Sequence, residues 1–417
     1  MNIWNWRLRK ISRALWLRAS IFSLIAVFVA LFANHLGFFI PDWLPSRIGA
    51  DSVQSILTII ASSMLAVTTF SLTAMVGALV AATQDVTPRA ARLLMADKTT
   101  HNVLSTFLGA FLFSLVGLIA LGANAYNEQG RAVLFGATIV MIAVIVATLL
   151  RWIEHLSAFG RLVDTTQRVE IAATESMRAR KEMPYLGGVV RAPNLVAANL
   201  NGSAVHVGEY GYVQHIDMVL LGELCEQHQI ELDLFCLPGS YVGPGKPVAI
   251  ASSPELDETC RAQLAEAFEI DHVRIYDQDP RFGVCVLTEI ASRALSPAIN
   301  DPGTAIDVLG RHVRILATWS VPEPSPSEPV TQRVRVPDLK IEDLFDDAFR
   351  PIARDGAHMV EIQIRLQKAL AALAATGEER YRKNARRISR LALERARLSG
   401  MIDADLQLVQ EAARGVA

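Results

Sequence analysis

Hydroxyl side chains recur along an uncharged apolar segment, Ser52–Thr83, at a spacing that would gather them on one face of a helix. At 100° per residue, five of these hydroxyls fall within a sector of about 60°. A glycine lies beside this sector, and a glutamine just beyond the segment continues it. The stripe consists of Ser55, Thr58, Ser62, Thr69, Thr73, Gly77 and Gln84.

Two kinds of role would explain this stripe. In a pore, hydroxyl oxygens replace part of an ion's hydration without burying a charge. In a packed bundle, small hydroxyl residues let neighbouring helices approach closely and hydrogen-bond. Five hydroxyls on one face are more than a single helix contact requires. We therefore favour a pore built from one such helix per subunit of a homo-oligomer, with the permeating ion and further copies of the chain as partners.

Charged residues follow the stripe directly and could form the cytoplasmic mouth of that pore. A ring of Asp85 carboxylates would attract cations, whereas Arg89 and Arg92 would favour anions. The alternative is that Asp85 or Thr87 caps the next helix, which begins with a proline at its first position. The two roles can coexist.

A second candidate site is the polar turn that contains Ser296, Asn300, Asp301 and Thr304. A helix that starts here could present backbone N–H groups to an anion. The carboxylate of Asp301 would, however, occupy the position of that anion. Aspartate followed by proline is also what helix initiation prefers, so we expect a structural turn and keep ligand binding as the alternative.

Other catalytic or metal-binding patterns are absent from the sequence. The segment Pro238–Pro247 resembles a phosphate loop only loosely, because Ser240 stands where GxxxxGK needs its first glycine and Pro247 replaces the Ser or Thr that binds magnesium. We interpret it as a turn between strands. No HExxH or GxSxG motif occurs, and the four cysteines have no CxxC spacing. We expect no enzyme activity, no metal and no cofactor.

Four apolar runs in the first third of the chain predict a membrane protein with four transmembrane helices. Each run is at or near the roughly 20 residues that a spanning helix needs. No Asp, Glu, Lys or Arg lies inside them, whereas coupled transporters usually carry such a group. The first run is too long for a cleavable signal peptide and should remain as an anchor. The runs are Ala19–Ile40, Ser52–Thr83, Val103–Ala123 and Ala132–Leu150.

Basic residues predict the orientation of these helices. Five basic and no acidic residues precede the first run, and basic residues also follow the second and the fourth. Because the cytoplasmic side retains them, both termini and the large C-terminal domain should be cytoplasmic. Because the apolar runs carry no Asp, Glu, Lys or Arg, passive conduction or anchoring in the lipid bilayer is the role left for the membrane part.

The region after the membrane part predicts a cytoplasmic α+β structure. We expect a transmembrane domain over residues 1–155, a helical connector over 156–203, a ferredoxin-like β-α-β-β-α-β module over 204–280 and a helical domain over 281–417 with a proline-rich linker at 321–337. The last helix, Glu378–Ser399, carries many arginines. Acidic residues dilute them, which favours a solvated or oligomer-packing helix over one that binds nucleic acid or lipid.

The twelve residues Ala294–Ala305 closely resemble a stretch of the domain of unknown function 2254 family of bacterial inner-membrane proteins. Further similarity lies at Thr83–Arg89, Gly211–Asp217 and Pro238–Pro247, so the resemblance covers nearly the whole chain. It implies a bacterial inner-membrane location and this architecture, but no activity. Our hypothesis is a homo-oligomeric ion channel. The alternative is a membrane-anchored sensor or scaffold whose cytoplasmic module binds a small ligand or a partner protein.

Overall fold

The computed structural model describes residues 20–21, 23–25, 27–29, 31–32, 50–85, 87–95, 97–158, 161–192, 202–320 and 328–416. The chain divides into two compact units, Arg7–Thr165 and Thr166–Ala417. Each unit is described by itself below.

Three helices of the first unit are long and apolar enough to cross a membrane, over Asp51–Ala81, Lys98–Gly122 and Glu128–Leu156. Of the predicted first span, Ala19–Ile40, most residues lie outside the described part of the chain. The described residues between 20 and 32 are helical. The helices of this unit are α3 (Ala50–Asp85), α4 (Pro88–Met95), α5 (Lys98–Gly122) and α6 (Glu128–Ala158).

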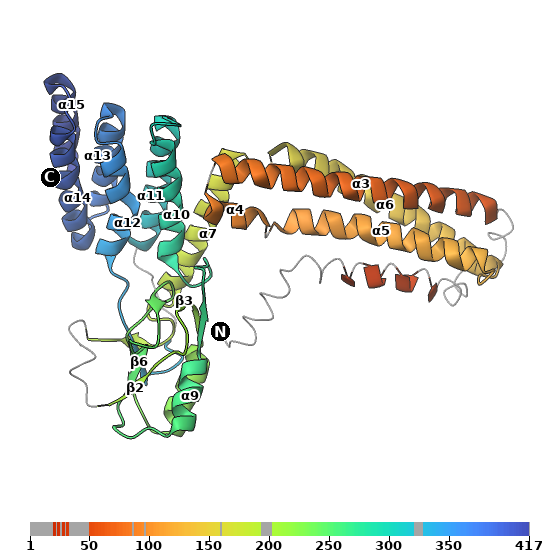
Figure 1. The fold of residues 1–417 in the computed structure, drawn as a ribbon, viewed down its shortest axis with the longest axis horizontal. Helices are drawn as coiled ribbons and strands as arrows, with labels where there is room; N and C mark the ends of the chain where they lie inside the picture. The colour runs from red at the N-terminus through yellow and green to blue at the C-terminus, as the bar shows by residue number, and fades with distance from the viewer. Residues whose placement is uncertain are drawn as a thin grey trace. The chain divides into compact units, whose positions relative to one another are not determined.

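Helix α5 is the most buried of the three candidate spans, and α3 and α6 run alongside it (Figure 1). Within the most apolar 18-residue stretch of each helix, the buried share is 61% in α5, 11% in α3 and 17% in α6. Leu57 of α3 packs against Phe113 of α5 and Leu134 of α6. Most of the surface of α3 is therefore not covered by the other described helices of this unit.

A contact between an aspartate and a histidine ties α5 to α6 at one end of the bundle. Asp97 caps α5 by accepting a hydrogen bond from Thr100 N at 2.7 Å. Its Oδ2 also lies 2.9 Å from His155 Nε2 of α6. The single carboxylate thus satisfies a helix start and fixes the neighbouring helix.

The second unit is a mixed α/β region followed by helices. Its helices are α7 (Leu162–Glu182, which begins at the end of the first unit), α8 (Met218–Gln227), α9 (Glu258–Glu266), α10 (Pro280–Ala294), α11 (Pro302–Ser320), α12 (Ile341–Asp355), α13 (Val360–Ala374), α14 (Glu379–Leu398) and α15 (Asp403–Ala413), with a 3-10 turn at Arg414–Val416. Its strands are β1 (Val189–Val190), β2 (Ser203–Val205), β3 (Gly211–Ile216), β4 (Leu232–Leu234), β5 (Tyr241–Val242), β6 (Ala249–Ala251), β7 (Phe268–Asp271) and β8 (Val334–Val336).

The strands form two sheets, which corrects the prediction of one ferredoxin-like module over residues 204–280. The element order β3-α8-β4-β6-α9-β7 is the predicted β-α-β-β-α-β series. However, β3 pairs with β5 and β7 in a three-stranded sheet, while β4 and β6 belong to a five-stranded sheet of order β1-β8-β4-β6-β2. Strands β1 and β8 come from outside the predicted module and pair in parallel.

Three local differences distinguish the observed strands from the predicted ones. The predicted strand over residues 204–216 is two strands in different sheets, because the chain between them bends at Gly208 and Glu209. The strand expected at residues 272–276 lies earlier, at Phe268–Asp271, where apolar and acidic side chains alternate with the period of a strand. Residues 334–336 of the predicted linker form β8.

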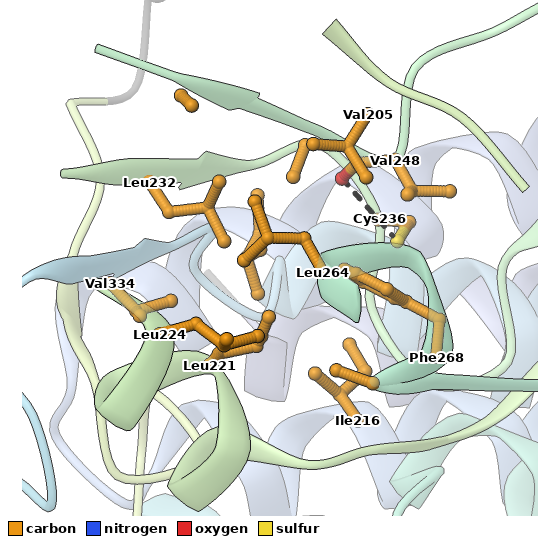
Figure 2. Close-up of a cluster of buried hydrophobic side chains, with 14 of the residues drawn as sticks. Val205, Ile216, Leu221, Leu224, Leu232, Cys236, Val248, Leu264, Phe268 and Val334 are labelled. Carbon is orange, nitrogen blue, oxygen red and sulfur yellow. Dashed lines mark hydrogen bonds between the residues drawn. The ribbon is translucent and has the colours of Figure 1, made fainter. Parts of the chain in front are cut away.

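Both sheets share one hydrophobic core (Figure 2). Ile216 of β3 and Phe268 of β7 come from the smaller sheet, and Leu232 and Val334 from the larger one. Leu221 of α8 joins them, with α9 contributing from the same cluster. One buried core makes this α/β part a single module despite its two sheets.

Helices α10 to α15 stand next to one another and complete this unit (Figure 1). Helix α10 packs against α11 and α12, and α13 packs against α11, α14 and α15. Tyr381 of α14 is fully buried, and its hydroxyl donates to the Leu316 carbonyl of α11 at 2.7 Å. The buried tyrosine is thus hydrogen-bonded, as its polar group requires.

Candidate functional site

The predicted stripe lies on the open face of α3. Each of its described side chains is exposed in the single chain, namely Ser55, Thr58, Ser62, Thr69, Thr73 and Gly77. The buried side chains of the same helix include Val53, Leu57, Ile60, Met64 and Ser71. At 100° per residue the two sets are centred roughly 180° apart. The face with the hydroxyls is therefore the one that points away from α5 and α6. The side chain of Gln84 lies outside the described residues.

Four hydroxyls of the stripe donate to a backbone carbonyl one turn earlier in α3. These bonds are Thr58 Oγ1 to Gln54 O at 2.8 Å, Ser62 Oγ to Thr58 O at 3.0 Å, Thr69 Oγ1 to Leu65 O at 2.9 Å and Thr73 Oγ1 to Thr69 O at 3.0 Å. Each hydroxyl proton is thereby engaged within the helix. The oxygen keeps acceptor lone pairs for a cation or for a water proton.

Two exposed valines interrupt the stripe after Thr73. At 100° per residue, Val76 and Val80 fall within the same sector as the hydroxyls. Their side chains are 51% and 52% exposed. The polar part of this face is consequently followed by two apolar side chains before the helix ends.

The predicted mouth contains the junction between α3 and α4. Helix α3 extends to Asp85, whose side chain lies outside the described residues. Thr87 caps α4, since its Oγ1 accepts a hydrogen bond from Ala90 N at 3.3 Å and Pro88 takes the first helical position. Leu94 of α4 packs against the last turns of α3. Helix α4 therefore folds against α3.

Arg89 and Arg92 occupy the exposed side of α4, opposite its buried alanines and Leu94. An amphipathic helix of this kind, with arginines on its polar face, suits the interface of a membrane.

The polar turn before α11 is held together by its own side chains. Asp301 Oδ1 accepts a hydrogen bond from Thr304 N at 3.1 Å, and Oδ2 accepts one from Thr304 Oγ1 at 2.5 Å. Ser296 Oγ donates to Arg293 O at 2.7 Å. Asn300 adopts a left-handed backbone with φ of 51°. The hydrogen bonds from Thr304 also lower the pKa of Asp301. These contacts make the turn a helix start, with the carboxylate where an anion would lie.

Among the residues that the structure describes, no three His, Cys, Asp or Glu side chains come together as a metal ion would need. Three of the cysteines, Cys225, Cys236 and Cys285, have their thiol pKa raised to about 12 by burial. They are poor nucleophiles at neutral pH.

A basic cavity in the second unit was not predicted from the sequence. It has a volume of about 400 Å³ and is lined from α7, the loop after β1, the end of β4, the segment before α10 and the start of α12. Its charged lining residues are Arg180, Arg191, Arg274, Asp279, Arg281, Asp338, Lys340 and Asp343. The sequence pattern that marks part of this cavity is Asp279 followed by Pro280, and that pattern predicts only the start of a helix.

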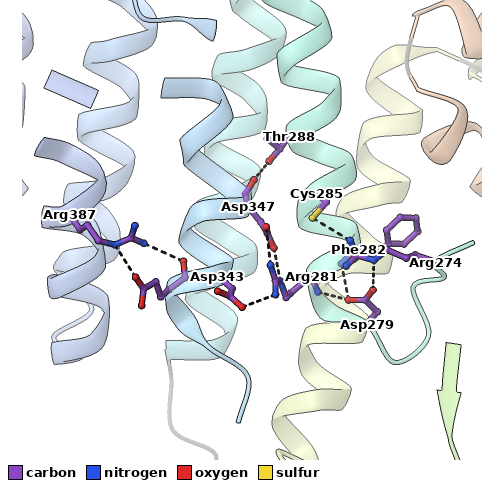
Figure 3. Close-up of polar contacts among 10 residues, drawn as sticks. Arg274, Asp279, Arg281, Phe282, Cys285, Thr288, Asp343, Asp347 and Arg387 are labelled. Atoms are coloured by element: carbon purple, nitrogen blue, oxygen red, sulfur yellow. Dashed lines mark hydrogen bonds and ion pairs between the residues drawn. The ribbon is translucent and has the colours of Figure 1, made fainter. Parts of the chain in front are cut away.

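Ion pairs organise one wall of that cavity (Figure 3). Arg274 Nε donates to Asp279 Oδ2 at 2.8 Å, and Asp279 also caps α10 by accepting from Arg281 N and Phe282 N, each at 3.1 Å. Arg281 Nη1 donates to Asp343 Oδ2 at 2.7 Å, and its Nε donates to Asp347 at 2.7 Å. These bonds connect α10 to α12.

The fold defines an integral membrane protein with a soluble C-terminal domain. The comparison with protein families identifies it further, because residues 12–372 match the family described as predicted membrane protein (DUF2254). The match covers most of the chain, so the chain belongs to this family.

Relatives with curated sequences carry no assigned function. An uncharacterized protein of Mycobacterium tuberculosis is 26% identical over 291 residues, which cover 65% of this chain and 53% of the relative. An uncharacterized protein of Mycobacterium bovis matches with the same identity and coverage. The chain thus spans about half the length of the curated relatives it matches. No solved structure matches the chain.

Proposed function

We propose that the protein is a homo-oligomeric channel for small cations in the bacterial inner membrane. In this proposal α3 lines the pore, and the C-terminal domain lies in the cytoplasm, where it assembles or gates the channel. The observation that carries the proposal is the position of the hydroxyl stripe on the face of α3 that the other described helices leave exposed.

Oligomerisation is a requirement of this proposal. The exposed stripe of one chain cannot enclose a water-filled path, whereas several copies of α3 arranged around an axis can. Closed cyclic symmetry would place Thr58, Thr69 and Thr73 of every copy toward the axis. Exposed apolar residues elsewhere on α3, such as Ile59 and Phe70, would then contact lipid or a neighbouring subunit.

The preference for cations rests on the direction of the hydroxyl protons. Because Thr58, Ser62, Thr69 and Thr73 donate their protons to backbone carbonyls, their oxygens keep only lone pairs for a further partner. Oxygen lone pairs replace the hydration of a cation but not that of an anion. Val76 and Val80 would form an apolar constriction that closes by dewetting.

Ion flux into liposomes containing the full-length protein tests the proposal. Thr69→Val keeps the shape of the side chain but removes its oxygen, and it should lower cation flux several-fold. The matched control is Ser63→Ala, since Ser63 is exposed but lies outside the stripe. A folded protein that conducts no ion, that conducts equally with Val at position 69, or that stays monomeric in detergent and in bilayers would contradict the channel.

The basic cavity of the C-terminal domain favours a second function, a membrane-anchored sensor or scaffold that binds a small ligand. In that case the stripe on α3 packs against another helix or faces lipid. Thr69→Val would then change stability or assembly without any effect on permeation.

A further inference from the structure

Arg180 of α7 is a buried cation whose hydrogen-bonding capacity is mostly unused. The residue is 2% exposed. Its Nη2 donates to the Gln278 carbonyl at 3.3 Å, whereas Nε and Nη1 are buried without a hydrogen-bond partner. Burial lowers the pKa of Arg180 to about 10, and the charges of Asp279 and Asp338 oppose this shift. The guanidinium therefore remains charged at neutral pH.

Guanidinium N–H groups that are buried without an acceptor lose their hydration without replacement, which costs free energy. Neutral carbonyls of the protein do not balance the charge. An acceptor that is itself negatively charged would therefore offset most of this free-energy cost. Arg180 lines the cavity of about 400 Å³ described above. The buried cation with unused hydrogen-bonding capacity is therefore also a lining residue of the cavity.

Two of the three carboxylates that line this cavity accept short hydrogen bonds from other groups, and the third, Asp338, is half exposed and lies 3.8 Å from Arg380. Asp279 accepts from Arg274 and from the first N–H groups of α10. Asp343 accepts from Arg281 at 2.7 Å. Neither carboxylate forms a hydrogen bond with Arg180, although Asp279 lies near enough to influence its pKa.

Two further cations border the cavity. Arg191 donates from Nη1 to the Leu234 carbonyl at 2.6 Å and lies over the Phe235 ring, with its Cζ 4.3 Å from the ring centre. Its Nε is also buried without a partner. Lys340 is exposed at the start of α12. Five basic and three acidic side chains line the cavity, so its field favours an anion.

We propose that this cavity binds a small organic oxyanion, a molecule that carries a phosphate or a carboxylate group, with Arg180 and Arg191 as its hydrogen-bond donors and Lys340 at the entrance. Guanidinium groups match the geometry of both anions, because they can donate two parallel hydrogen bonds. The volume lies in the range of small-molecule sites. This binding site is independent of whether α3 conducts ions. It would provide the ligand for the second proposed function, a membrane-anchored sensor.

Calorimetric titration of the full-length protein in detergent tests this site. The probes are inorganic phosphate, AMP, ATP and citrate, with sodium chloride at matched ionic strength as the baseline. A phosphate ester that binds more tightly than citrate identifies phosphate as the recognised group, and the reverse order identifies a carboxylate. Binding of either kind supports an oxyanion site.

Variants locate the binding in the cavity. Arg191→Gln and Lys340→Gln should each weaken it, with about tenfold loss for a charged contact worth roughly 1.4 kcal/mol. Arg180→Met should abolish it. The matched control is Arg365→Gln, because Arg365 is an exposed arginine of α13 outside the cavity.

If Arg180→Met does not fold, Arg191→Gln and Lys340→Gln still show whether the probes bind in the cavity. The proposal is overturned if folded wild type binds none of the probes at millimolar concentration. It is equally overturned if both Gln variants bind as the wild type does. Neither result affects the channel proposal, since ion flux is measured separately.

Discussion

The carboxylate of Glu170 on α7 accepts a hydrogen bond of 2.5 Å from Arg311 Nη1 on α11. Arg314, one turn further along α11, donates to the same carboxylate at 2.6 Å from Nε and 3.0 Å from Nη2. Burial alone would raise the pKa of Glu170, but the hydrogen bonds and charges of Arg314 and Arg311 outweigh it and hold this pKa below its ordinary value. One carboxylate thus joins two helices that are far apart in sequence.

We expect Glu170→Gln to destabilise the C-terminal domain by about 1–3 kcal/mol, because it weakens a charged hydrogen bond and leaves Arg311, 8% exposed, without that countercharge. Thermal unfolding of the full-length protein in detergent measures the loss, and faster hydrogen exchange in α7 and α11 would locate it. The control is Arg314→Gln. Its side chain is 58% exposed, so the loss should stay below about 1 kcal/mol. Equal losses in both variants would contradict this account.

His312 of α11 should make the protein sensitive to mild acid. Its Nε2 lies 2.9 Å from Thr288 Oγ1, and that hydroxyl donates to the Asp347 carbonyl at 2.7 Å, so Nε2 carries the ring proton. Burial lowers the pKa of His312 to about 3, although Glu170 opposes the shift. The folded state keeps the ring neutral where the unfolded state, with a pKa of 6.5, binds a proton.

The sign of the pH effect follows from this difference. Since the unfolded state binds more protons between the two pKa values, the free energy of unfolding should fall as pH falls below 6.5, by up to about 1.4 kcal/mol per pH unit. Urea unfolding at several pH values from 7 to 5 measures the slope. His312→Gln keeps an N–H donor without titrating and should show a shallower slope. A variant with the same slope as the wild type would assign the effect to other groups.

Gly283 of α10 marks a close helix crossing. A Cβ atom at this position would lie 2.4 Å from the Cβ and 2.9 Å from the Cα of Ala173 on α7. Gly283→Ala should therefore push the helices apart and cost about 1–3 kcal/mol. The matched control is Gly310→Ala on α11, where a new Cβ would meet only the tip of Arg314 at 3.7 Å. That variant should gain about 0.5–1 kcal/mol, because alanine favours a helix. Thermal unfolding compares the two, and a stabilising Ala at position 283 would contradict the crossing.

Local patterns allowed much of the helical structure to be predicted. The apolar run Ser52–Thr83 lies within α3, and the Asp301-Pro302 pair starts α11, because length, capping and periodicity act between neighbouring residues. The stripe on α3 could also be placed, since side-chain positions on a helix follow from spacing alone. The partner of that face could not be predicted from the sequence, because lipid, water and a second subunit can all lie against it.

The sheets and the cavity depend on contacts between distant segments. Strand β1 has two residues and β8 has three, which is too short for a period-two pattern to appear. Their pairing joins Val189 to Arg335 across the whole α/β module. The cavity likewise combines Arg180 with Lys340, and no motif connects residues so far apart. Only the tertiary structure brings them together.

Cysteine substitution along α3 distinguishes a pore face from a packing face. Three classes of hydroxyl residue are available for a conservative change. Thr58, Thr69 and Thr73 belong to the stripe, Ser63 is exposed outside it, and Ser71 is buried. If α3 lines a wet pore, a water-soluble thiosulfonate should modify cysteines of the stripe and block flux, because thiolate formation needs water. Cysteine at 63 or 71 should react slowly or not at all.

The unmodified protein provides the baseline for this experiment. All four native cysteines lie after residue 224, and the thiol pKa of Cys225, Cys236 and Cys285 is raised to about 12, so they should react little at pH 7. Mass spectrometry of the labelled protein counts the modified sites. If no stripe cysteine reacts in folded protein, the stripe is a packing or lipid-facing surface, because a wet pore would admit the reagent. If Ser63→Cys reacts as fast as Thr69→Cys, water reaches both sides of the helix and the stripe is not a distinct pore lining.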